Sequence, residues 1–550
     1  MEKKRLRPKL FDVMGSYTKE QLVKDLVSGI IVAIIALPLS IALALASGVG
    51  PEQGIYTAII AGFLISFFGG SRVQIAGPTA AFATIVAGIV ATNGMDGLIV
   101  ATIMAGILLI LMGIFRLGTL IKFIPFTITT GFTAGIAVTI VIGQLKDFMG
   151  LTYAEGLKPV ETMEKLTAVF KSLGTFNWQA FLVGMICLAI LIVWPYISKK
   201  IPGSLIAVVA GIIMVKGLNM NVNTIGDLYT ISSGFPAFHI PHITFEIISS
   251  EIGDAFTIAI LAAIESLLSC VVADSMINSK HNSNMELVAQ GIGNIGSALF
   301  GGIPATGAIA RTAANIKNGG RTPIAGMVHS IVLVLVLLVL MPYAALIPMP
   351  TIAAILFMVA WNMCGIEKFI LLLKRAPKSD IIVLVATFVL TIVFDLVVAI
   401  EVGMIAACVL FMKRMSEESE VKGWKYYDDS DNDPDAIEHR TVPSYVRVYE
   451  INGPLFFGMS DRIADITTRD KTKCLIIRMR GVPSVDASAM YALEDLLDKC
   501  NKNHVQLIFS HVNEQPLKVM KQGGYYDRVG AENYCPHIDD ALRRAVEIGE

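Results

Sequence analysis

The sequence has too little charge for a soluble protein of its length. Only 16% of its 550 residues are Asp, Glu, Lys or Arg, and 54% are apolar, whereas soluble proteins carry about 25% charged residues. Most of the chain therefore lies in lipid. The net charge of −1 hides three unlike parts: a basic start over 1–21, a nearly continuous apolar region over 22–412, and ordinary soluble composition over 413–550.

Motifs for several other chemistries are missing as well. The seven cysteines are scattered without metal-type spacing, and cysteines in apolar runs behave as small hydrophobes, so we expect no disulfide, no metal and no cofactor. There is no nucleotide-binding motif, which excludes transport driven by ATP. Nothing in the chain indicates an enzyme, and we expect no nucleic acid partner.

Apolar runs predict the number of membrane spans. Runs of about 16–25 residues suit a hydrocarbon core of ~30 Å, and two interrupted helices at 78–92 and 305–318 bring the total to fourteen. The other twelve candidates lie near 24–46, 53–69, 95–115, 122–145, 178–198, 203–217, 254–277, 286–300, 323–341, 346–361, 379–394 and 397–412.

Loop charges predict the orientation of these spans. The segments 47–53, 92–96, 217–252 and 342–350 contain no Lys or Arg, whereas the segments on the other side contain several. Segment 146–177, with four lysines, is an exception that is long enough for the positive-inside rule to weaken. We therefore expect an even span count, a cell (inner) membrane location, and cytoplasmic N- and C-termini.

Two stretches interrupt the apolar region in the same way. Gly301–Thr312 and Gly77–Ala83 each place glycine, proline and threonine inside apolar sequence. Because proline and paired glycines do not continue a helix, we expect one helix to begin at Ala305 and another near Pro78, each after a short extended piece.

The spacing of the two stretches predicts an internal repeat. They fall on the third and tenth spans, so seven spans separate equivalent elements, and an odd number inverts the second copy. We therefore expect an all-α membrane domain over 22–415, built as a 7+7 inverted repeat of about 22–217 and 250–415. Paired interrupted segments are a sequence pointer to a transporter's binding site.

A helix start attracts an anion through its unpaired N–H groups and its positive dipole end. We expect Thr79 and Thr306 either to cap the half-helices or to donate their hydroxyls to an anion. The backbone N–H groups of Ala80, Gly307 and Ala308 would donate too. Arg311 adds a full positive charge, either as an anion contact or as an arginine that reaches the cytoplasmic surface.

Glu265 is an acid in the middle of an apolar helix over 256–276. An intramembrane acid is costly and is by default functional, and Ser269 lies four residues later on the same helix face. Glu265 either carries a coupling ion or is a structural partner for Arg311. Glu401 is a weaker second candidate, and His329 reads as an ordinary polar residue near a helix end.

The last part of the chain predicts a separate soluble domain. An acidic run over 416–440 is typical of a solvated linker. Alternating strands then follow at Tyr445–Ile451, Lys473–Met479 and Gln506–Ser510, with amphipathic helices at Ser488–Asn501 and Gln515–Gln522. This pattern predicts an α/β domain over 441–550.

With these features the chain resembles the SulP anion permeases, the family of sulfate permeases and related anion transporters, which end in a STAS domain. The motifs that carry the resemblance are Ala36-Leu37-Pro38, Gly50-Pro51, Gly77-Pro78-Thr79-Ala80, Ala263-Ile264-Glu265-Ser266 and Gly301-Gly302-Ile303-Pro304. Phe357–Met363 is similar to bacterial members likened to C4-dicarboxylate transporters. The resemblance implies a core and a gate domain, an elevator-like movement, and a homodimer.

The resemblance also implies roles for single residues. It implies a cation-coordinating or proton-carrying carboxylate at Glu265, a hydroxyl beside it at Ser269, and an arginine near the anion pocket at Arg311. In the STAS domain, Asp486-Ala487-Ser488 stands where related domains have a phosphorylation motif, but the motif's first hydroxyl and its glycine are missing. We therefore expect a module for oligomerisation and trafficking, with a possible cytoplasmic protein partner.

The predicted function is secondary active transport of sulfate, a C4-dicarboxylate or bicarbonate, coupled to H⁺ or Na⁺ in contact with membrane lipid. Half-helix starts bind charge without selecting shape, so the anion stays open among these three. The alternatives are a nucleobase permease of the same fold, a passive anion channel, and a membrane scaffold that acts through the STAS domain. Uptake of uracil or xanthine, or channel-sized currents, would distinguish them.

Overall fold

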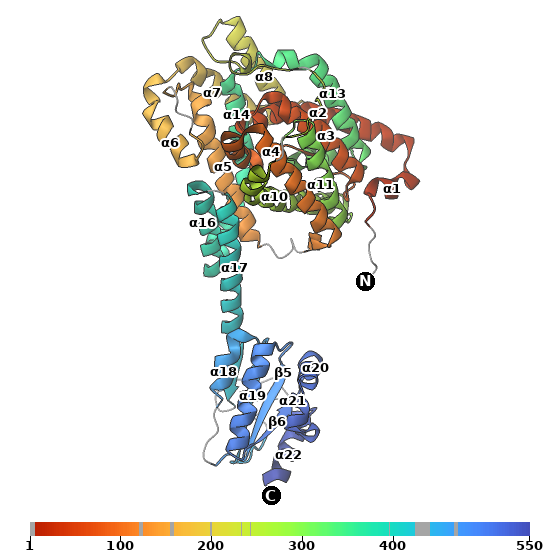
Figure 1. The fold of residues 1–550 in the computed structure, drawn as a ribbon, viewed down its shortest axis with the longest axis vertical. Helices are drawn as coiled ribbons and strands as arrows, with labels where there is room; N and C mark the ends of the chain where they lie inside the picture. The colour runs from red at the N-terminus through yellow and green to blue at the C-terminus, as the bar shows by residue number, and fades with distance from the viewer. Residues whose placement is uncertain are drawn as a thin grey trace. The chain divides into compact units, whose positions relative to one another are not determined.

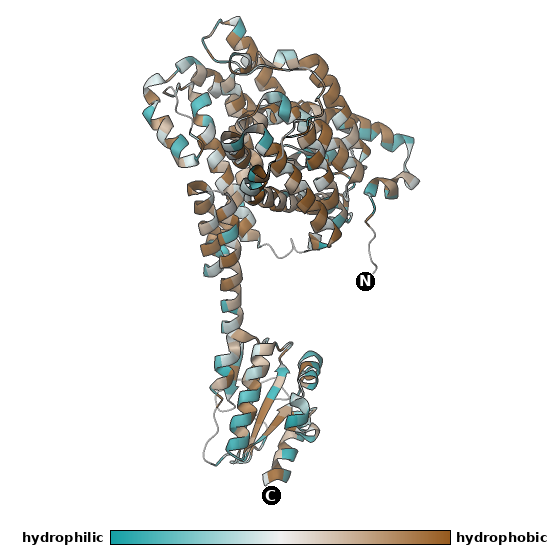
Figure 2. Ribbon diagram, viewed as in Figure 1, coloured by the Kyte–Doolittle hydropathy of each residue, from teal (hydrophilic) through white to brown (hydrophobic). Residues whose placement is uncertain are grey.

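The computed structural model describes residues 6–119, 125–154, 159–198, 201–232, 234–241, 244–394, 396–423, 440–466 and 471–549. It divides into two compact units, Met1–Met404 and Ile405–Glu550. The first unit is helical and the second combines helices with a sheet (Figure 1). Apolar residues run along whole helices of the first unit, whereas the helices of the second unit alternate between apolar and polar residues (Figure 2).

The first unit contains the helices that the apolar runs predict. Of its described helices, eight segments have the length and hydropathy to cross a membrane, among them α2, α3, α5, α7, α10 and α13. The full set of bounds is α1 Lys9–Val13, α2 Lys19–Ala46, α3 Pro51–Phe68, α4 Ala83–Ile114, α5 Phe126–Met149, α6 Thr162–Lys171, α7 Trp178–Ile197, α8 Gly203–Gly217, α9 Ile225–Leu228, α10 Phe245–Ile277, α11 Ser283–Leu299, α12 Ile309–Lys317, α13 Ile324–Ala344, α14 Met349–Cys364, α15 Ile366–Arg375, α16 Lys378–Val393 and α17 Leu396–Glu418.

Two of these helices are interrupted in the way that the inverted repeat predicts. Helix α4 bends at Gly94, whose φ of 64° is left-handed, so residues 83–93 and 95–114 are separate segments. Helix α12 has nine residues and rises only about 14 Å, roughly half of a ~30 Å hydrocarbon core. Both half-helices therefore begin inside the membrane domain. With α4 counted as two segments, a helical segment lies at each of the fourteen predicted positions in the described residues.

The helices of the first unit pack in two groups. One group contains α2, α3, α4, α10, α11, α12 and α13, and the other contains α5, α7, α8, α14 and α16. Within the first group α4 and α11 approach closely, because a Cβ added at Gly106 would lie 2.8 Å from the carbonyl oxygen of Gly291. Small residues permit such close backbone approach between membrane helices.

A two-stranded ribbon crosses the first group of helices. Strand β1, Ala76–Gly77, pairs antiparallel with β2, Thr306–Gly307, and Ala76 lies opposite Gly307. The predicted helix start at Ala305 is therefore wrong: β2 occupies those positions, and α12 begins at Ile309 with Ala308 as its N-cap. On the other side, a 3₁₀ turn, Ala80–Phe82, leads directly into α4. Unpaired N–H and C=O groups are costly in lipid, and pairing the two extended segments satisfies them.

The second unit is an α/β domain around a five-stranded sheet of order β3-β4-β5-β6-β7. Strands β4 to β7 are parallel, and β3 pairs antiparallel with β4 at the edge. The three predicted strands and two predicted helices are confirmed within two residues. The bounds are β3 Glu420–Gly423, β4 Val446–Asn452, β5 Cys474–Gly481, β6 Gln506–Ser510, β7 Tyr534–Cys535, α18 Ser460–Ala464, α19 Ala487–Lys502, α20 Glu514–Gln522, α21 Tyr525–Val529 and α22 Ile538–Gly549.

The segment predicted as an acidic linker is partly structured. Helix α17 continues to Glu418, and β3 occupies 420–423. The structured part is thus an edge strand of the sheet rather than a linker, and the run of aspartates at 428–435 lies outside the described residues.

Candidate functional site

The first half-helix contacts an intramembrane acid. Thr79 is the N-cap residue of the 3₁₀ turn, yet its side chain makes no capping hydrogen bond. Its hydroxyl instead donates to Oε2 of Glu265, at 2.9 Å. The capping interpretation of Thr79 is therefore wrong, and the carboxylate of α10 faces the start of the first half-helix.

The second half-helix uses its polar groups to hold the ribbon. The hydroxyl of Thr306 donates to the carbonyl oxygen of Ala262 on α10, at 3.0 Å. The N–H of Ala308, which we expected to donate to an anion, already donates to the carbonyl oxygen of Ile75, at 2.9 Å. Thr306 is not a cap either, because Ala308 holds that position. Both groups thus fasten β2 in place, while Ala80 and Gly307 lie buried beside them.

Arg311 is a buried cation in the first turn of α12. Only 1% of its surface is exposed, so the prediction of a side chain that reaches the cytoplasmic surface is wrong. Its Nη2 donates to Oγ of Ser40 on α2, at 3.3 Å, and to the carbonyl oxygen of Pro78, at 3.2 Å. Its Nε and Nη1 have no partner in the described structure. An arginine with two unpaired buried donors is suited to an anion.

Arg311 and Glu265 do not form an ion pair among the described residues. They are instead joined through the chain, because Arg311 bonds to Pro78 and Glu265 bonds to the next residue, Thr79. The alternative in which the two side chains hold the half-sites together by direct pairing is therefore wrong in this conformation.

The described hydrogen bond of Ser269 runs to α12, not to Glu265. Its hydroxyl is 3.4 Å from Oγ1 of Thr312 on α12, and the same Thr312 oxygen accepts the N–H of Ile75 at 3.0 Å. Ser269 is 1% exposed. It thus ties α10 to α12 and to the segment that leads into β1.

Each half-helix of the site contacts a polar side chain on a long helix of the first group. Helix α10 supplies Glu265 to the first half-helix, and α2 supplies Ser40 to the second. Helices α2 and α10 each open one of the two predicted repeats, so the acid and the hydroxyl come from corresponding helices of that prediction. Among these described contacts, the first half-helix bonds to an acid, Glu265, and the second half-helix carries a cation, Arg311.

Sequence reasoning missed two buried polar residues near the site. Glu286 on α11 is fully buried and accepts four hydrogen bonds. His329 was predicted near a helix end, but it lies within α13, fully buried, with neither ring nitrogen partnered in the described structure. A signal for Glu286 existed, since polar residues recur at 286, 290 and 294, which is a helical spacing inside an apolar run.

Comparison with known proteins identifies the family. A model of the "Sulfate permease family" matches residues 22–387, and a "STAS domain" model matches 434–541. The chain is 40% identical over 529 residues to "Putative sulfate transporter YvdB" of Bacillus subtilis (strain 168), covering 95% of this chain and 98% of that protein. The chain belongs to the sulfate permease family.

Other family members and solved structures agree with this assignment. "Bicarbonate transporter BicA" of Picosynechococcus sp. is 30% identical over 544 residues, covering 95% of this chain and 94% of that protein. The solved transmembrane domain of a cyanobacterial BicA matches with a TM-score of 0.62 and 31% identity, over 71% of this chain and 98% of that one. These relatives are named as transporters, and none is named as an enzyme.

The likeness also extends to a more distant fold relative. Murine Slc26a9 matches with a TM-score of 0.88 at 20% identity, covering 98% of this chain and 94% of that chain, a likeness that concerns the fold alone. The sulfate permease family chain described here is thus a multi-pass membrane protein with a helical membrane domain and a C-terminal STAS domain.

Asp486 in the STAS domain has a structural role. Asp486 is the N-cap of α19, and its Oδ1 accepts the N–H of Ala489 at 2.8 Å. Its Oδ2 accepts the N–H of Phe457 at 3.0 Å. Asp486 therefore closes the start of α19 against the preceding turn.

Proposed function

We propose that this chain is a secondary active transporter of a small anion: sulfate, a C4-dicarboxylate or bicarbonate. The observation that carries the proposal is that Glu265 and the partly unpaired guanidinium of Arg311 bond to Thr79 and Pro78, the two residues that follow the paired strand β1. In this proposal the anion binds at the two half-helix starts, to Thr79, Ala80, Gly307 and Arg311. Thr306 and Ala308 shape this site by holding β2.

Coupling to a cation is assigned to Glu265, with Ser269 behind it. Moving one charge against 100 mV costs about 2.3 kcal/mol, so an anion entering a negative cell needs a companion cation. Glu265 has one described hydrogen-bond donor, the hydroxyl of Thr79. Its carboxylate therefore has room to take up H⁺ or Na⁺, and family names that include both sulfate and bicarbonate transporters support an anionic substrate.

The two groups of helices support an elevator-like movement. The half-helices, the ribbon, α10 and α11 all belong to the group around α2 and α3, whereas α5, α7, α8, α14 and α16 pack on one another. The first group would carry the anion as a core that slides against the second as a gate. We further propose a homodimer in the cell membrane with both termini cytoplasmic, as the loop charges predict, and a partner-binding role for the STAS domain.

Uptake into proteoliposomes tests the proposal. A thermal-shift screen with sulfate, succinate, fumarate, bicarbonate and chloride selects the anion, and inward H⁺ or Na⁺ gradients are then applied separately. Accumulation of the anion under one gradient is expected. Glu265→Gln should abolish dependence on that gradient, whereas Glu401→Gln, which changes an exposed acid on α17, should retain it.

Two other outcomes would count against this function. Uptake of uracil or xanthine in place of the anions would favour the nucleobase alternative, which the family assignment disfavours. Conductance of many thousands of ions per second in planar bilayers would favour a passive channel. Retained gradient dependence in Glu265→Gln would remove Glu265 from the coupling mechanism.

A further inference from the structure

Helix α11 carries a buried stripe of polar side chains along one face. Glu286, Gln290, Asn294 and Ser297 follow one another at spacings of four, four and three residues, which places them on the same side of a helix. Each of the four is 0% exposed. Buried polar groups cost free energy unless they are hydrogen-bonded, so the partners of the stripe explain why it is there.

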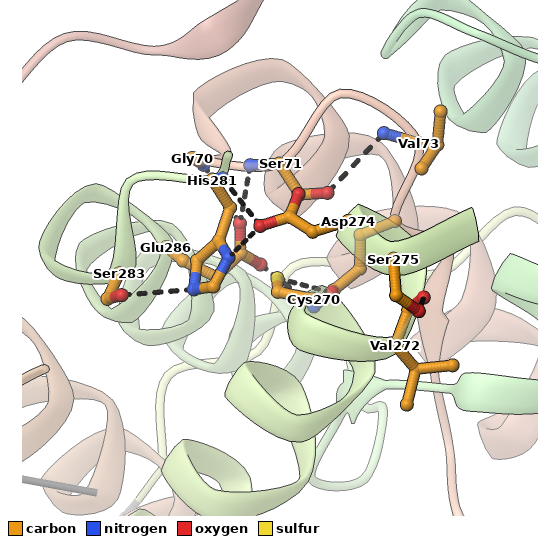
Figure 3. A network of polar contacts seen from close by, with 11 residues as sticks. Gly70, Ser71, Val73, Cys270, Val272, Asp274, Ser275, His281, Ser283 and Glu286 are labelled. Carbon is orange, nitrogen blue, oxygen red and sulfur yellow. Dashed lines mark hydrogen bonds and ion pairs between the residues drawn. The ribbon is translucent and has the colours of Figure 1, made fainter. Parts of the chain in front are cut away.

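One end of the stripe holds the segment that leads into β1. Oε2 of Glu286 accepts the N–H groups of Gly70 and Ser71, at 2.8 and 3.0 Å. Its Oε1 accepts the side-chain amides of Gln74 and Gln290, both at 2.9 Å. Figure 3 shows this carboxylate beside Gly70 and Ser71, with dashed lines to them. The entry to β1 is thus fastened to α11 at three points.

Gln74 connects Glu286 to the other strand, β2. Its Oε1 accepts the thiol of Cys270 on α10, at 2.7 Å, so its amide is held from two helices. That amide lies against Gly307 of β2, where any added Cβ would overlap it. Gln74 is therefore held in place against Gly307, which is one of the residues assigned to the anion.

The other end of the stripe holds the segment that leads into β2. Oδ1 of Asn294 accepts the N–H of Ala305 at 2.8 Å, and its Nδ2 donates to the carbonyl oxygen of Ala305 at 2.8 Å. The hydroxyl of Ser297 donates to the carbonyl oxygen of Ile303, also at 2.8 Å. One face of α11 thus makes hydrogen bonds to the segments that lead into both β1 and β2.

We propose that this stripe is the positioning element of the anion site: it sets the spacing of β1 and β2 and thereby the affinity for the anion. Glu286 and Asn294 are positioning residues in this assignment, and they act through Gln74, Gly307 and Ala305. The proposal rests on the proposed function, since it concerns the same site.

Glu286 is a second intramembrane acid, but its contacts separate it from a coupling role. A carboxylate offers about four lone-pair sites, and four donors fill those of Glu286. A proton could bind only after one donor had left. Asp274 and His281 are the neighbouring titratable pair in Figure 3, with Oδ2 and Nδ1 2.7 Å apart. Nε2 of His281 lies 3.0 Å from Oγ of Ser283, and the described bonds do not connect the pair to Glu286 directly.

Isosteric variants test the assignment. In Glu286→Gln the new NH₂ group faces two donors in either orientation: the N–H groups of Gly70 and Ser71, or the side-chain amides of Gln74 and Gln290. In Asn294→Asp a carboxylate oxygen faces the carbonyl oxygen of Ala305. Each change should raise the KM for the anion about tenfold or more, because Glu286→Gln loses hydrogen bonds to a charged group and Asn294→Asp leaves a buried carbonyl without its donor. The response to the H⁺ or Na⁺ gradient should persist, because Glu265 is intact.

A swap and a control complete the design. In Gln74→Glu with Glu286→Gln, the new amide can donate both to the carboxylate now at position 74 and to the oxygen of Gln290 that has no partner in the described structure. The loss of transport in the double variant should therefore be smaller than the sum of the losses in the two single variants. Thr102→Val removes a fully buried hydroxyl whose described hydrogen bond runs to its own helix, at 2.7 Å, and should keep the wild-type KM.

Hydrogen exchange gives a readout that does not depend on transport. Backbone amides over 70–77 should exchange faster in Glu286→Gln, those over 303–308 should do so in Asn294→Asp, and neither should change in Thr102→Val. Unchanged KM and unchanged exchange in both variants would overturn the proposal, as would additive effects in the swap. Loss of gradient dependence in Glu286→Gln would overturn it too, by making Glu286 a coupling residue. A wild-type protein that transports no anion overturns the proposed function instead, and the exchange data still report on strand positioning.

Discussion

The hydroxyl of Thr79 donates a 2.9 Å hydrogen bond to Oε2 of Glu265, although 186 residues separate them in the chain. The bond joins the start of the first half-helix to the middle of α10, and therefore joins the two predicted repeats at the site itself. An anion that approaches Thr79 and a cation that binds Glu265 would compete for, or share, the same hydroxyl. In the proposed mechanism this contact directly links the substrate to the coupling ion.

Substitution of Thr79 tests that link. Thr79→Ser keeps the hydroxyl and should retain gradient-driven uptake, whereas Thr79→Val removes the donor with little change in volume. We expect Thr79→Val to lower the initial rate of uptake about tenfold, since a hydrogen bond to a charged group contributes roughly 1.5–3 kcal/mol. Equal rates in the two variants would show that the hydroxyl has no role in transport.

The buried charge of Arg311 predicts an unusual response to substitution. A buried charge without an ionic partner costs free energy, so Arg311→Met should keep or raise the Tm of the detergent-solubilised protein. The same variant should lose the Tm increase that the anion produces in wild type. Arg311→Lys should also bind poorly, because a lysine lacks the planar fork of donors. A lower Tm in Arg311→Met would indicate a structural role instead.

Glycine at the ribbon predicts a steric test. A Cβ at Gly77 in β1 would overlap the guanidinium of Arg311, whereas a Cβ at Gly88, in the half-helix that follows, meets no atom within 4 Å. Gly77→Ala should therefore displace Arg311 and weaken anion binding by at least about tenfold, and Gly88→Ala should leave binding unchanged. Isothermal titration with the selected anion measures both, and equal affinities would contradict the placement of Arg311.

The edge strand of the STAS domain predicts where a soluble fragment should begin. Strand β3 pairs with β4 over Glu420–Gly423, so a fragment of 416–550 keeps a covered edge that a fragment of 441–550 exposes. Exposed edges promote aggregation. We expect the longer fragment to unfold at a higher urea concentration and to remain monodisperse at concentrations where the shorter one associates. Equal midpoints would mean that β3 adds no stability.

The sequence by itself determined the elements whose signals are local. A membrane span requires about 20 apolar residues, so the runs located most helices of the first unit to about one turn, although α10 begins at Phe245 rather than at the predicted residue 254. An acid in such a run is conspicuous, so Glu265 could be found without a structure. The strands β4, β5 and β6 were likewise found, because alternation over five or more residues is a local pattern.

Only the tertiary structure decided the contacts between distant segments. Two-residue strands such as β1 and β2 have no periodicity to detect, and their pairing moved the start of α12 from Ala305 to Ile309. Thr79, Arg311 and Glu286 have partners that lie 186, 271 and 216 residues away in the sequence. Whether a polar side chain caps a helix, binds a ligand or holds a neighbouring strand depends on what lies beside it in space, because hydrogen bonds act over about 3 Å, and sequence spacing does not report that distance.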